Sequence, residues 1–525
     1  MKSFFKRILI LLGVIFLIVG TFLGIQSIRL NWLESPTITT LPELTPDQKA
    51  EDMAYLLDLT RQVSQVDAVW EVAGLENPLD AVDNWIDRAR KTESNQAFAD
   101  LVLQYLVHAG QGGHAYLAFD ANFNLTISLV GNIPKDAFAR MPLWGQEINQ
   151  LPWYAHSNLD IVYSQGQYVL DQESVVGEIT LPEGAVVIKV DDLDTDAFVL
   201  QQQYYAHLRY DPAESKFFLY PLLIIDPGRP GWNLTLRLQD GSAQTVFVNK
   251  IPGYVSFRQD ENSAENIGCL TLTEDILYIR IRTFFYEYAA SDGPILRDCF
   301  ASGNFQKVIF DVRGNNGGEI WSYMENIIAP LIEEPVSYER IAAVKESFFR
   351  WYGWRLRLFK ALNSNDLTDP HTHLQQVEQI ALLPYSDEGW HVMRITRQIE
   401  PASNSFPFEG RAYVLTDNDT LSAGDSFAAA MQVTGLAKVV GANTVGWGQA
   451  YQAKMLYALP NSGILFYLDS ELTFNSDGSL DNYIGVIPDV MLDASSYPTP
   501  YPASLDRESI LSDTWVQWVL ADPLE

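Results

Sequence analysis

The chain has 525 residues, of which 47% are apolar and 12% aromatic. This length and composition predict a globular protein of two to four domains and exclude a disordered one. The formal net charge of −31 excludes a general nucleic-acid binder, because phosphate backbones are bound by clustered Lys and Arg side chains.

The cysteines and histidines show no metal-binding pattern. Cys269 and Cys299 are too few for a disulfide framework, and they form either one bridge or two buried thiols. Only His371 and His373 are close in sequence, and an isolated H-x-H is more typical of a loop or a strand than of a metal site. We therefore expect no metal.

The N-terminal segment predicts a membrane helix. Lys2, Lys6 and Arg7 precede an uncharged apolar run at 8–25, which is long enough to cross the hydrocarbon layer. The positive-inside rule then places the N-terminus in the cytoplasm and the rest of the chain outside it. We interpret residues 1–30 as an uncleaved single-pass anchor in the cell membrane, with a cleaved signal and a secreted protein as the alternative.

A proline-containing tether (31–46) and a helical module (47–130) follow. Helical periodicity covers Asp47 to Val63, 81–90 and 95–108, whereas the stretch from Trp70 to Leu79 interrupts it.

The last of these helices ends in Gly110-Gln111-Gly112-Gly113-His114, before the strand-like Tyr116 and Leu117. His114 therefore lies in a glycine-rich joint, where the backbone can approach a ligand closely. A histidine in a loop is otherwise most often an ordinary surface residue.

Residues 161–255 predict a separate small β domain. They contain several strand-like runs, a helix from Asp196 to His207, and a hairpin that turns at Asp240-Gly241. The domain serves either peptide docking or structure alone.

Two strand–loop–helix units come next, within a core assigned to 265–334 and 406–495. The first runs from Lys307 through Gly317 and Gly318 into a helix, and the second from Arg411 through Ser422 into a helix. Such units predict neighbouring strands of a mostly parallel α/β sheet, whose ligands bind at the carboxyl ends of the strands. Residues 335–405 are interpreted as an insertion or lid, and 496–525 as a C-terminal helical segment.

Ser422 stands between the end of a buried strand and the start of a helix. Its hydroxyl either caps the helix or acts as a nucleophile, since the free N–H groups of the first helical turn stabilise nearby negative charge.

Four separated motifs together resemble the S41 family of serine peptidases. They are Gly113-His114, Asp311-x-Arg313-x-Asn315-x-Gly317-Gly318, Ser422-Ala423-Gly424-Asp425 and Gly485-Val486-Ile487-Pro488-Asp489. The resemblance covers about residues 45 to 495 and implies a ClpP/crotonase-like core, with a PDZ-like module at the position of the small β domain. It also implies hydrolysis of polypeptides, including C-terminal (tail-specific) processing, through an acyl-enzyme and without metal or cofactor.

Carried over by position, the resemblance makes Ser422 the nucleophile. The N–H of Ala423, with that of Gly317 or Gly318, would form the oxyanion hole.

The general base departs from the commonest family pattern. C-terminal processing proteases have a lysine in a G-K-G turn, whereas this chain has Gly446-Trp447-Gly448, and the nearby Lys454 lies on a later segment. The resemblance to the tricorn-like branch instead implies His114 as base, with Asp481 as its orienting carboxylate and Asp477 as the alternative.

The sequence thus predicts a membrane-anchored extracytoplasmic serine endopeptidase. The alternative is a catalytically inactive peptide- or ligand-binding protein on the same scaffold, which Trp447 in the place of lysine keeps open.

Overall fold

The computed structural model describes most of the chain beyond the predicted membrane segment. The described residues are 38–111, 113–118, 133–149, 155–156, 159–222, 230–252, 265–348, 372–376, 389–448, 455–475, 478–493, 496–498, 502 and 504–523. The predicted anchor (1–30) and the first part of the predicted tether lie outside them. Within these ranges, no helix is both long and apolar enough to cross a membrane.

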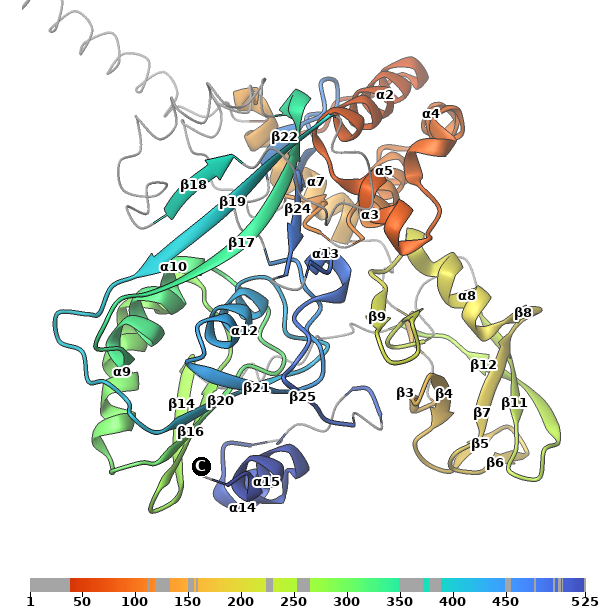
Figure 1. The fold of residues 1–525 in the computed structure, drawn as a ribbon. Helices are drawn as coiled ribbons and strands as arrows, with labels where there is room; N and C mark the ends of the chain where they lie inside the picture. Colours follow the sequence, from red (N-terminus) through yellow and green to blue (C-terminus); the bar gives the residue numbers. More distant parts are fainter. Residues whose placement is uncertain are drawn as a thin grey trace, which may run out of the picture.

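The centre of the fold is a mostly parallel sheet built from both halves of the predicted core (Figure 1). In the described part of the chain its order is β14-β15-β16-β20-β21-β25, in which only the β14–β15 pair is antiparallel. The strands are β14 (Ile267–Thr273), β15 (Ile276–Ile281), β16 (Lys307–Asp311), β20 (Arg411–Thr416), β21 (Ala437–Gly441) and β25 (Val490–Met491). This arrangement confirms the predicted α/β fold class.

Helices cover both faces of this sheet, because every central strand is buried on both sides. Phe310 and Phe427 belong to the core on one face, and Tyr413 and Trp515 to the core on the other. The first face carries α9 (Ala289–Ala301), α10 (Ile320–Tyr323), η3 (Tyr286–Tyr288), η4 (Met324–Ile328), η5 (Ala329–Leu331) and α12 (Ala423–Val433), and the second carries α14 (Arg507–Ser512) and α15 (Thr514–Ala521).

The final helix, predicted as continuous, is divided at Asp513, whose side chain caps α15.

Cys269 on β14 and Cys299 on α9 form a disulfide with a Cα–Cα distance of 6.0 Å. Of the two alternatives for these cysteines, one bridge or two buried thiols, the structure therefore has the bridge.

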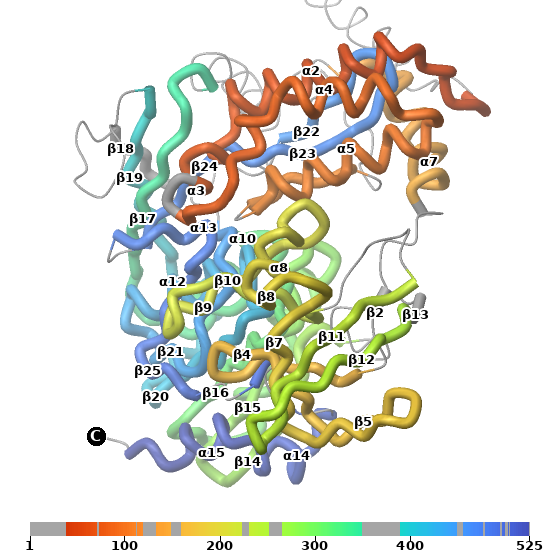
Figure 2. Tube along the Cα trace, turned by 90° about the vertical axis from the view of Figure 1, so that its right-hand side faces the viewer, coloured from red at the N-terminus to blue at the C-terminus, as the bar shows by residue number. Residues whose placement is uncertain are grey.

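The helical module shares its core with strands from the second half of the chain. A sheet of order β18-β19-β17-β24 and a smaller one of order β1-β23-β22 pack against it (Figures 1 and 2). The strands are β1 (Tyr116–Leu117), β17 (Val336–Lys345), β18 (Thr372–Gln376), β19 (Trp390–Ile399), β22 (Met455–Ala458), β23 (Leu465–Leu468) and β24 (Glu471–Phe474). Two strands of the predicted insertion, β17 and β19, therefore contribute to this core.

The helices in the described part of residues 38–149 include those predicted over 47–63, 81–90 and 95–108, whereas α7 was not predicted. They are α2 (Pro46–Val63), α3 (Val66–Ala73), η1 (Pro78–Ala81), α4 (Val82–Lys91), α5 (Asn95–Ala109) and α7 (Lys135–Asn149). The prediction of a break from Trp70 onward was wrong for α3. Val66, Val69 and Trp70 are fully buried, and a short helix buried nearly all round lacks the alternation that identifies an amphipathic one.

The β-rich module forms its own core and lies beside the central sheet (Figure 2). The predicted hairpin is confirmed, since β11 and β12 pair antiparallel and Gly241 has a φ of +82°. Its elements are β3 (Ile161–Ser164), β4 (Gln167–Leu170), β5 (Ser174–Val176), β6 (Ile179–Leu181), β7 (Val186–Val190), β8 (Leu193–Asp194), α8 (Thr195–Gln201), η2 (Gln202–Tyr204), β9 (Arg209–Asp211), β10 (Lys216–Phe218), β11 (Gly231–Arg237) and β12 (Ala243–Asn249).

Three short elements complete the description. They are β2 (Ala155–His156), which pairs with β13 (Ile251–Pro252), and α13 (Asp481–Ile484), which follows β24 and lies beside α12 (Figure 1).

Candidate active site

The loops that carry the sequence motifs meet at one edge of the central sheet. β16 and β20 are parallel neighbours with Asp311 opposite Leu415, so their carboxyl ends lie side by side. The loop after β16 is joined to the loop after β20 by several hydrogen bonds, of which two have backbone N–H donors. The Leu421 N–H donates to the Asn315 carbonyl at 2.9 Å, and the Gly314 N–H donates to Asp417 Oδ1 at 2.9 Å.

Ser422 has a backbone conformation that non-glycine residues rarely adopt. Its φ is +57° and its ψ −118°, directly before α12, and its N–H donates to the Gly446 carbonyl at 2.9 Å. Although Ser422 is at the N-cap position, its hydroxyl makes no capping hydrogen bond to the helix. The strained turn instead presents Oγ to the ring of His114, so the cap interpretation does not describe this serine.

His114 connects Ser422 to a buried carboxylate. Its Nε2 lies 3.3 Å from Ser422 Oγ, and its Nδ1 lies 3.2 Å from Asp469 Oδ2. The His114 backbone N–H also donates to Asp469 Oδ2, at 2.9 Å. With Asp469 accepting a proton from Nδ1, the neutral ring has its Nε2 lone pair facing the serine hydroxyl.

The contact between His114 and Asp469 follows from strand register. β1 pairs antiparallel with β23, with Tyr116 opposite Tyr467 and Leu117 opposite Phe466. Continued by two residues, the same register sets His114 opposite Asp469. Gly113 has no room for a side chain, since a Cβ there would lie 2.8 Å from Asp469 Oδ2 and 2.7 Å from Gln65 Nε2.

Asp481, the carboxylate predicted to orient His114, has different partners. Its Oδ1 lies 2.7 Å from Arg340 Nη2, and its Oδ2 accepts the Gly448 N–H at 3.1 Å. The register of β23 places Asp469 against the imidazole, whereas α13 starts after β24 and turns Asp481 toward β17, where Arg340 lies. The prediction that Asp481 contacts His114 was therefore wrong, and Asp469 is the carboxylate that lies against this imidazole. The alternative, Asp477, lies outside the described residues.

Asp481 belongs to a buried network behind α12. Arg340 lies between Asp481 and Asp425, with its Nη1 3.4 Å from Asp425 Oδ2, and Thr444 Oγ1 donates to Asp425 Oδ1 at 2.5 Å. Burial raises the pKa of Asp481 well above its ordinary value, and the neighbouring Asp425 carboxyl adds to this effect against the attraction of Arg340. One guanidinium thus faces two buried carboxyls.

Two backbone N–H groups are available to an oxyanion beside Ser422. Gly317 packs directly on the serine, because a Cβ added to it would lie 2.6 Å from Ser422 Cβ. However, the Gly317 N–H already donates to Asn315 Oδ1 at 2.9 Å. Among the residues that the structure describes, the N–H groups of Ala423 and Gly318 have no protein acceptor. Of the three predicted donors, the geometry favours these two.

Trp447 occupies the turn where the resemblance would place a lysine. Its ring meets His114 edge-to-face at a centroid distance of 5.6 Å and His207 at 4.9 Å. Burial, with Arg209 and His114 nearby, lowers the pKa of His207 to about 4. Trp447 thus packs against the imidazole, and Lys454 lies outside the described residues.

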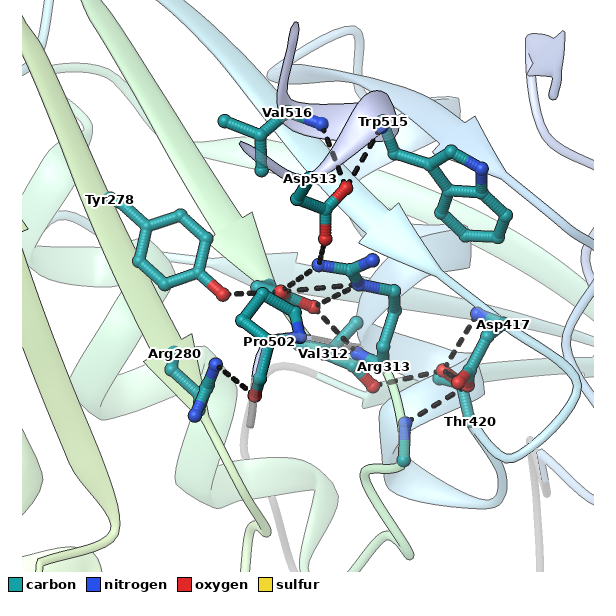
Figure 3. Close-up of polar contacts among 12 residues, drawn as sticks. Tyr278, Arg280, Val312, Arg313, Asp417, Thr420, Pro502, Asp513, Trp515 and Val516 are labelled. Atoms are coloured by element: carbon teal, nitrogen blue, oxygen red, sulfur yellow. Dashed lines mark hydrogen bonds and ion pairs between the residues drawn. The ribbon is translucent and has the colours of Figure 1, made fainter. Parts of the chain in front are cut away.

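A second buried network supports the segment that leads from β16 to the oxyanion loop (Figure 3). The Arg313 guanidinium lies 2.6 Å from Asp311 Oδ2 and 2.7 Å from Asp513 Oδ2, and Tyr278 OH also donates to Asp311. Burial acts against the charge of Asp311, yet Arg313 keeps the pKa of this carboxyl below its usual range. Asp311 and Arg313, the Asp and Arg of the D-x-R-x-N motif, therefore fix the backbone that precedes Gly317.

Asp417 links the two catalytic loops. Its Oδ1 accepts the N–H groups of Gly314 and Asp419, at 2.9 and 3.0 Å, and the Thr420 hydroxyl at 3.1 Å (Figure 3). Burial and the nearby Asp419 raise the pKa of Asp417 to about 6.

Sequence reasoning missed Asp469, Arg340 and Asp417 as contributors to the site. Asp469 directly follows the apolar, strand-like run 464–468, and pairing this run with Tyr116-Leu117 would have identified it. Asp417 was part of the polar loop before Ser422. Arg340 is a single cation on a strand, and the sequence has no signal for its partners.

The arrangement can activate a hydroxyl and stabilise an oxyanion. It holds a nucleophile, an imidazole, a carboxylate and two free N–H groups within one loop cluster, as acyl transfer requires. Within the described part of the chain, no group of three or more His, Cys, Asp or Glu side chains is placed to hold a metal ion.

Comparison with known families agrees with the chemistry of this loop cluster. Residues 275–492 match the model described as Peptidase family S41. This part of the chain is similar to S41 serine peptidases. Three of the four motifs lie in the matched range, and the chain is a serine-type peptidase. No curated protein matches the chain.

Several solved structures are similar to this chain. Mature CPAF matches with a TM-score of 0.51 and 15% identity, over 86% of this chain and 94% of CPAF. A serine-to-alanine mutant of CPAF has a TM-score of 0.51 and 14% identity, over 92% and 99% of the two chains. The photosystem II D1 C-terminal processing protease has a TM-score of 0.40 and 14% identity, over 88% and 96%. At these identities the two CPAF structures establish the fold alone.

Proposed function

We propose that this protein is a membrane-anchored extracytoplasmic serine endopeptidase in which Ser422 is the nucleophile and His114 the general base. The observation that carries the proposal is the continuous contact from Ser422 Oγ through His114 to Asp469, at 3.3 and 3.2 Å. Distances at the long end of the hydrogen-bond range are common in free enzymes and shorten when substrate binds.

The first half-reaction forms an acyl-enzyme. Ser422 Oγ attacks the scissile carbonyl while His114 Nε2 takes the hydroxyl proton. The Ala423 and Gly318 N–H groups donate to the tetrahedral oxyanion, and Asp469 stabilises the imidazolium through Nδ1. His114 then gives its proton to the leaving amine as the C–N bond breaks.

The second half-reaction releases the acid product. Water attacks the ester carbonyl as His114 takes its proton, and the imidazolium returns that proton to Ser422 Oγ. Every proton is transferred by His114, so no metal or cofactor enters either step, and a lysine at position 447 is not needed.

The extracytoplasmic location is supported by two features. The apolar run at 8–25 with preceding positive charges is typical of an N-in anchor, and the Cys269–Cys299 bridge suits an oxidising compartment. Carbonate extraction of membranes, followed by digestion of intact cells with an added protease, tests this placement. Material that is released by carbonate, or that stays protected in intact cells, would contradict it.

Hydrolysis of an unfolded polypeptide by full-length protein tests the catalytic assignment. Ser422→Ala and His114→Ala should each lower kcat by about 10³-fold or more while leaving the melting temperature within a few degrees. Turnover by Ser422→Ala equal to that of the parent would remove Ser422 from the mechanism. Full binding of peptide without turnover by the unmodified protein would favour the inactive binding protein.

A further inference from the structure

A group of aromatic side chains, two of them exposed, lies next to the candidate oxyanion hole. Tyr286 is 73% exposed, the highest value among the exposed large apolar side chains of the described residues, and its sequence neighbour Phe285 is 36% exposed. The Tyr286 ring packs edge-to-face on Trp321 at a centroid distance of 5.9 Å. We call Phe285, Tyr286 and Trp321 the aromatic patch. Adjacent exposed aromatic side chains are costly in water and commonly mark a binding surface.

The backbone fixes this patch to Gly318. Phe284, which is fully buried, donates its N–H to the Gly317 carbonyl at 2.8 Å and accepts the Glu319 N–H at 2.9 Å. A Cβ added to Gly318 would lie 2.6 Å from the Phe285 nitrogen. Phe285 and Tyr286 therefore follow directly from a segment bonded to the oxyanion loop, and Trp321 follows Gly318 by three positions. The patch cannot move independently of the candidate site.

We propose that the aromatic patch is a substrate subsite that takes an aromatic or large aliphatic side chain close to the scissile bond. This proposal rests on the proposed function, because a peptide whose carbonyl contacts the Ala423 and Gly318 N–H groups has to pass over Gly318. A neighbouring side chain of that peptide then lies over Phe285 and Tyr286. Burying an apolar side chain there removes its surface, and that of the patch, from water.

The charges around the patch favour the same class of substrate. Glu287 follows Tyr286, and Glu319 lies between Gly318 and Trp321; both are exposed. Their carboxylates repel an acidic side chain, whereas they leave an apolar one unaffected. Unfolded polypeptide segments expose the apolar side chains that such a subsite would bind, so the patch selects for apolar stretches of an unfolded chain.

The experiment compares internally quenched peptides that differ at one position at a time from P3 to P3′, with Phe, Leu, Gly or Glu. Full-length protein is used for kcat/KM, and full-length Ser422→Ala for binding of the same peptides by fluorescence anisotropy. At one position Phe or Leu should exceed Gly by about tenfold in kcat/KM and in affinity, with Glu lowest. The Phe/Gly ratio should fall toward one in Tyr286→Ala and Trp321→Ala, and stay high in Phe247→Ala, which removes an exposed aromatic side chain from β12.

The ratio is measured on one protein at a time, so partial misfolding of a variant cancels from it. Cleavage without preference at any position, or a preference that survives Tyr286→Ala and Trp321→Ala, would overturn the subsite while leaving the peptidase intact. A binding preference in Ser422→Ala without cleavage by the unmodified protein would overturn the proposed function and retain the subsite. If Tyr286→Ala changes the mass of the protein in analytical ultracentrifugation but leaves the Phe/Gly ratio in kcat/KM unchanged, the patch binds a second copy of the chain and the proposal is wrong.

Discussion

Acidic side chains lie on two sides of Ser422 and have different roles. On the base side, at the edge where β1 meets β23, Asp469 contacts His114, whose side chain is 12% exposed. On the support side, behind the two catalytic loops, Asp417 and Asp481 are buried with Arg313 or Arg340 nearby. Neither role follows from the residue type: Asp469 faces the imidazole that we propose as general base, whereas the support carboxyls face permanent cations and backbone N–H groups. Partners determine the role.

The largest expected effect is a loss of kcat on substitution of Asp469, on the base side. Asp469→Asn should lower kcat by about 10³- to 10⁴-fold, because a neutral amide cannot stabilise the positive charge of the His114 imidazolium. The free energy of unfolding should change by less than about 1 kcal/mol, since the His114 backbone N–H keeps an oxygen acceptor. Peptide hydrolysis and urea denaturation measure the two quantities. A kcat within threefold of the parent would remove Asp469 from the base side.

The same substitution on the support side should act in the opposite way. Asp481→Asn should lower the free energy of unfolding by about 1–3 kcal/mol, because one contact to Gly448, Arg340 or Asp425 is lost in a buried network. The kcat of the folded enzyme should stay within about tenfold, since Asp481 does not contact His114. A loss in kcat equal to that of Asp469→Asn would restore the sequence-based assignment of Asp481.

Displacing Asp469 without changing it should produce an intermediate effect. Gly113→Ala introduces a Cβ within 2.8 Å of Asp469 Oδ2, so either the carboxylate or the His114 backbone has to shift. A misplacement of about 1 Å costs on the order of 100-fold in kcat/KM. Gly293→Ala in α9, where the nearest atom is 3.4 Å away, is the matched control and should retain activity. Equal activity of the two variants would show that the base side tolerates such a shift.

The smallest expected effect concerns pH on the support side. The pKa of Asp417 is raised to about 6 in the folded protein. The free energy of unfolding therefore falls as the pH rises from about 4 through 6, because the folded state favours the protonated carboxyl. Asp417→Asn keeps an oxygen acceptor and cannot ionise, so it removes the free-energy cost of a buried carboxylate. It should therefore raise the free energy of unfolding at pH 7.5 by about 1–3 kcal/mol. The difference between variant and parent should vanish below about pH 4. Urea denaturation at several pH values measures it, and a difference that grows on acidification would contradict the assignment.

The two sides also differ in how far the sequence could predict them. Ser422, His114 and the Gly317-Gly318 turn each follow a strand or helix whose end has a clear local signal, so their loops could be placed at one sheet edge. Asp469 could not be selected by spacing, because its contact with His114 depends on the register between β1 and β23, which are far apart in the chain. Arg340 could not be selected at all, because a strand predicted as part of an insertion gives no indication that it packs behind α12. Local signals placed the loops, and long-range pairing assigned the partners.

The central claim is that His114, oriented by Asp469, activates Ser422. The most direct measurement is the rate at which a fluorophosphonate probe labels the full-length protein, with the modified residue located by peptide mass spectrometry. We predict labelling at Ser422 in the parent, slowed by at least about 100-fold in both His114→Ala and Asp469→Asn and unchanged in Phe247→Ala. Labelling of Ser422 in His114→Ala at the rate of the parent would contradict the account.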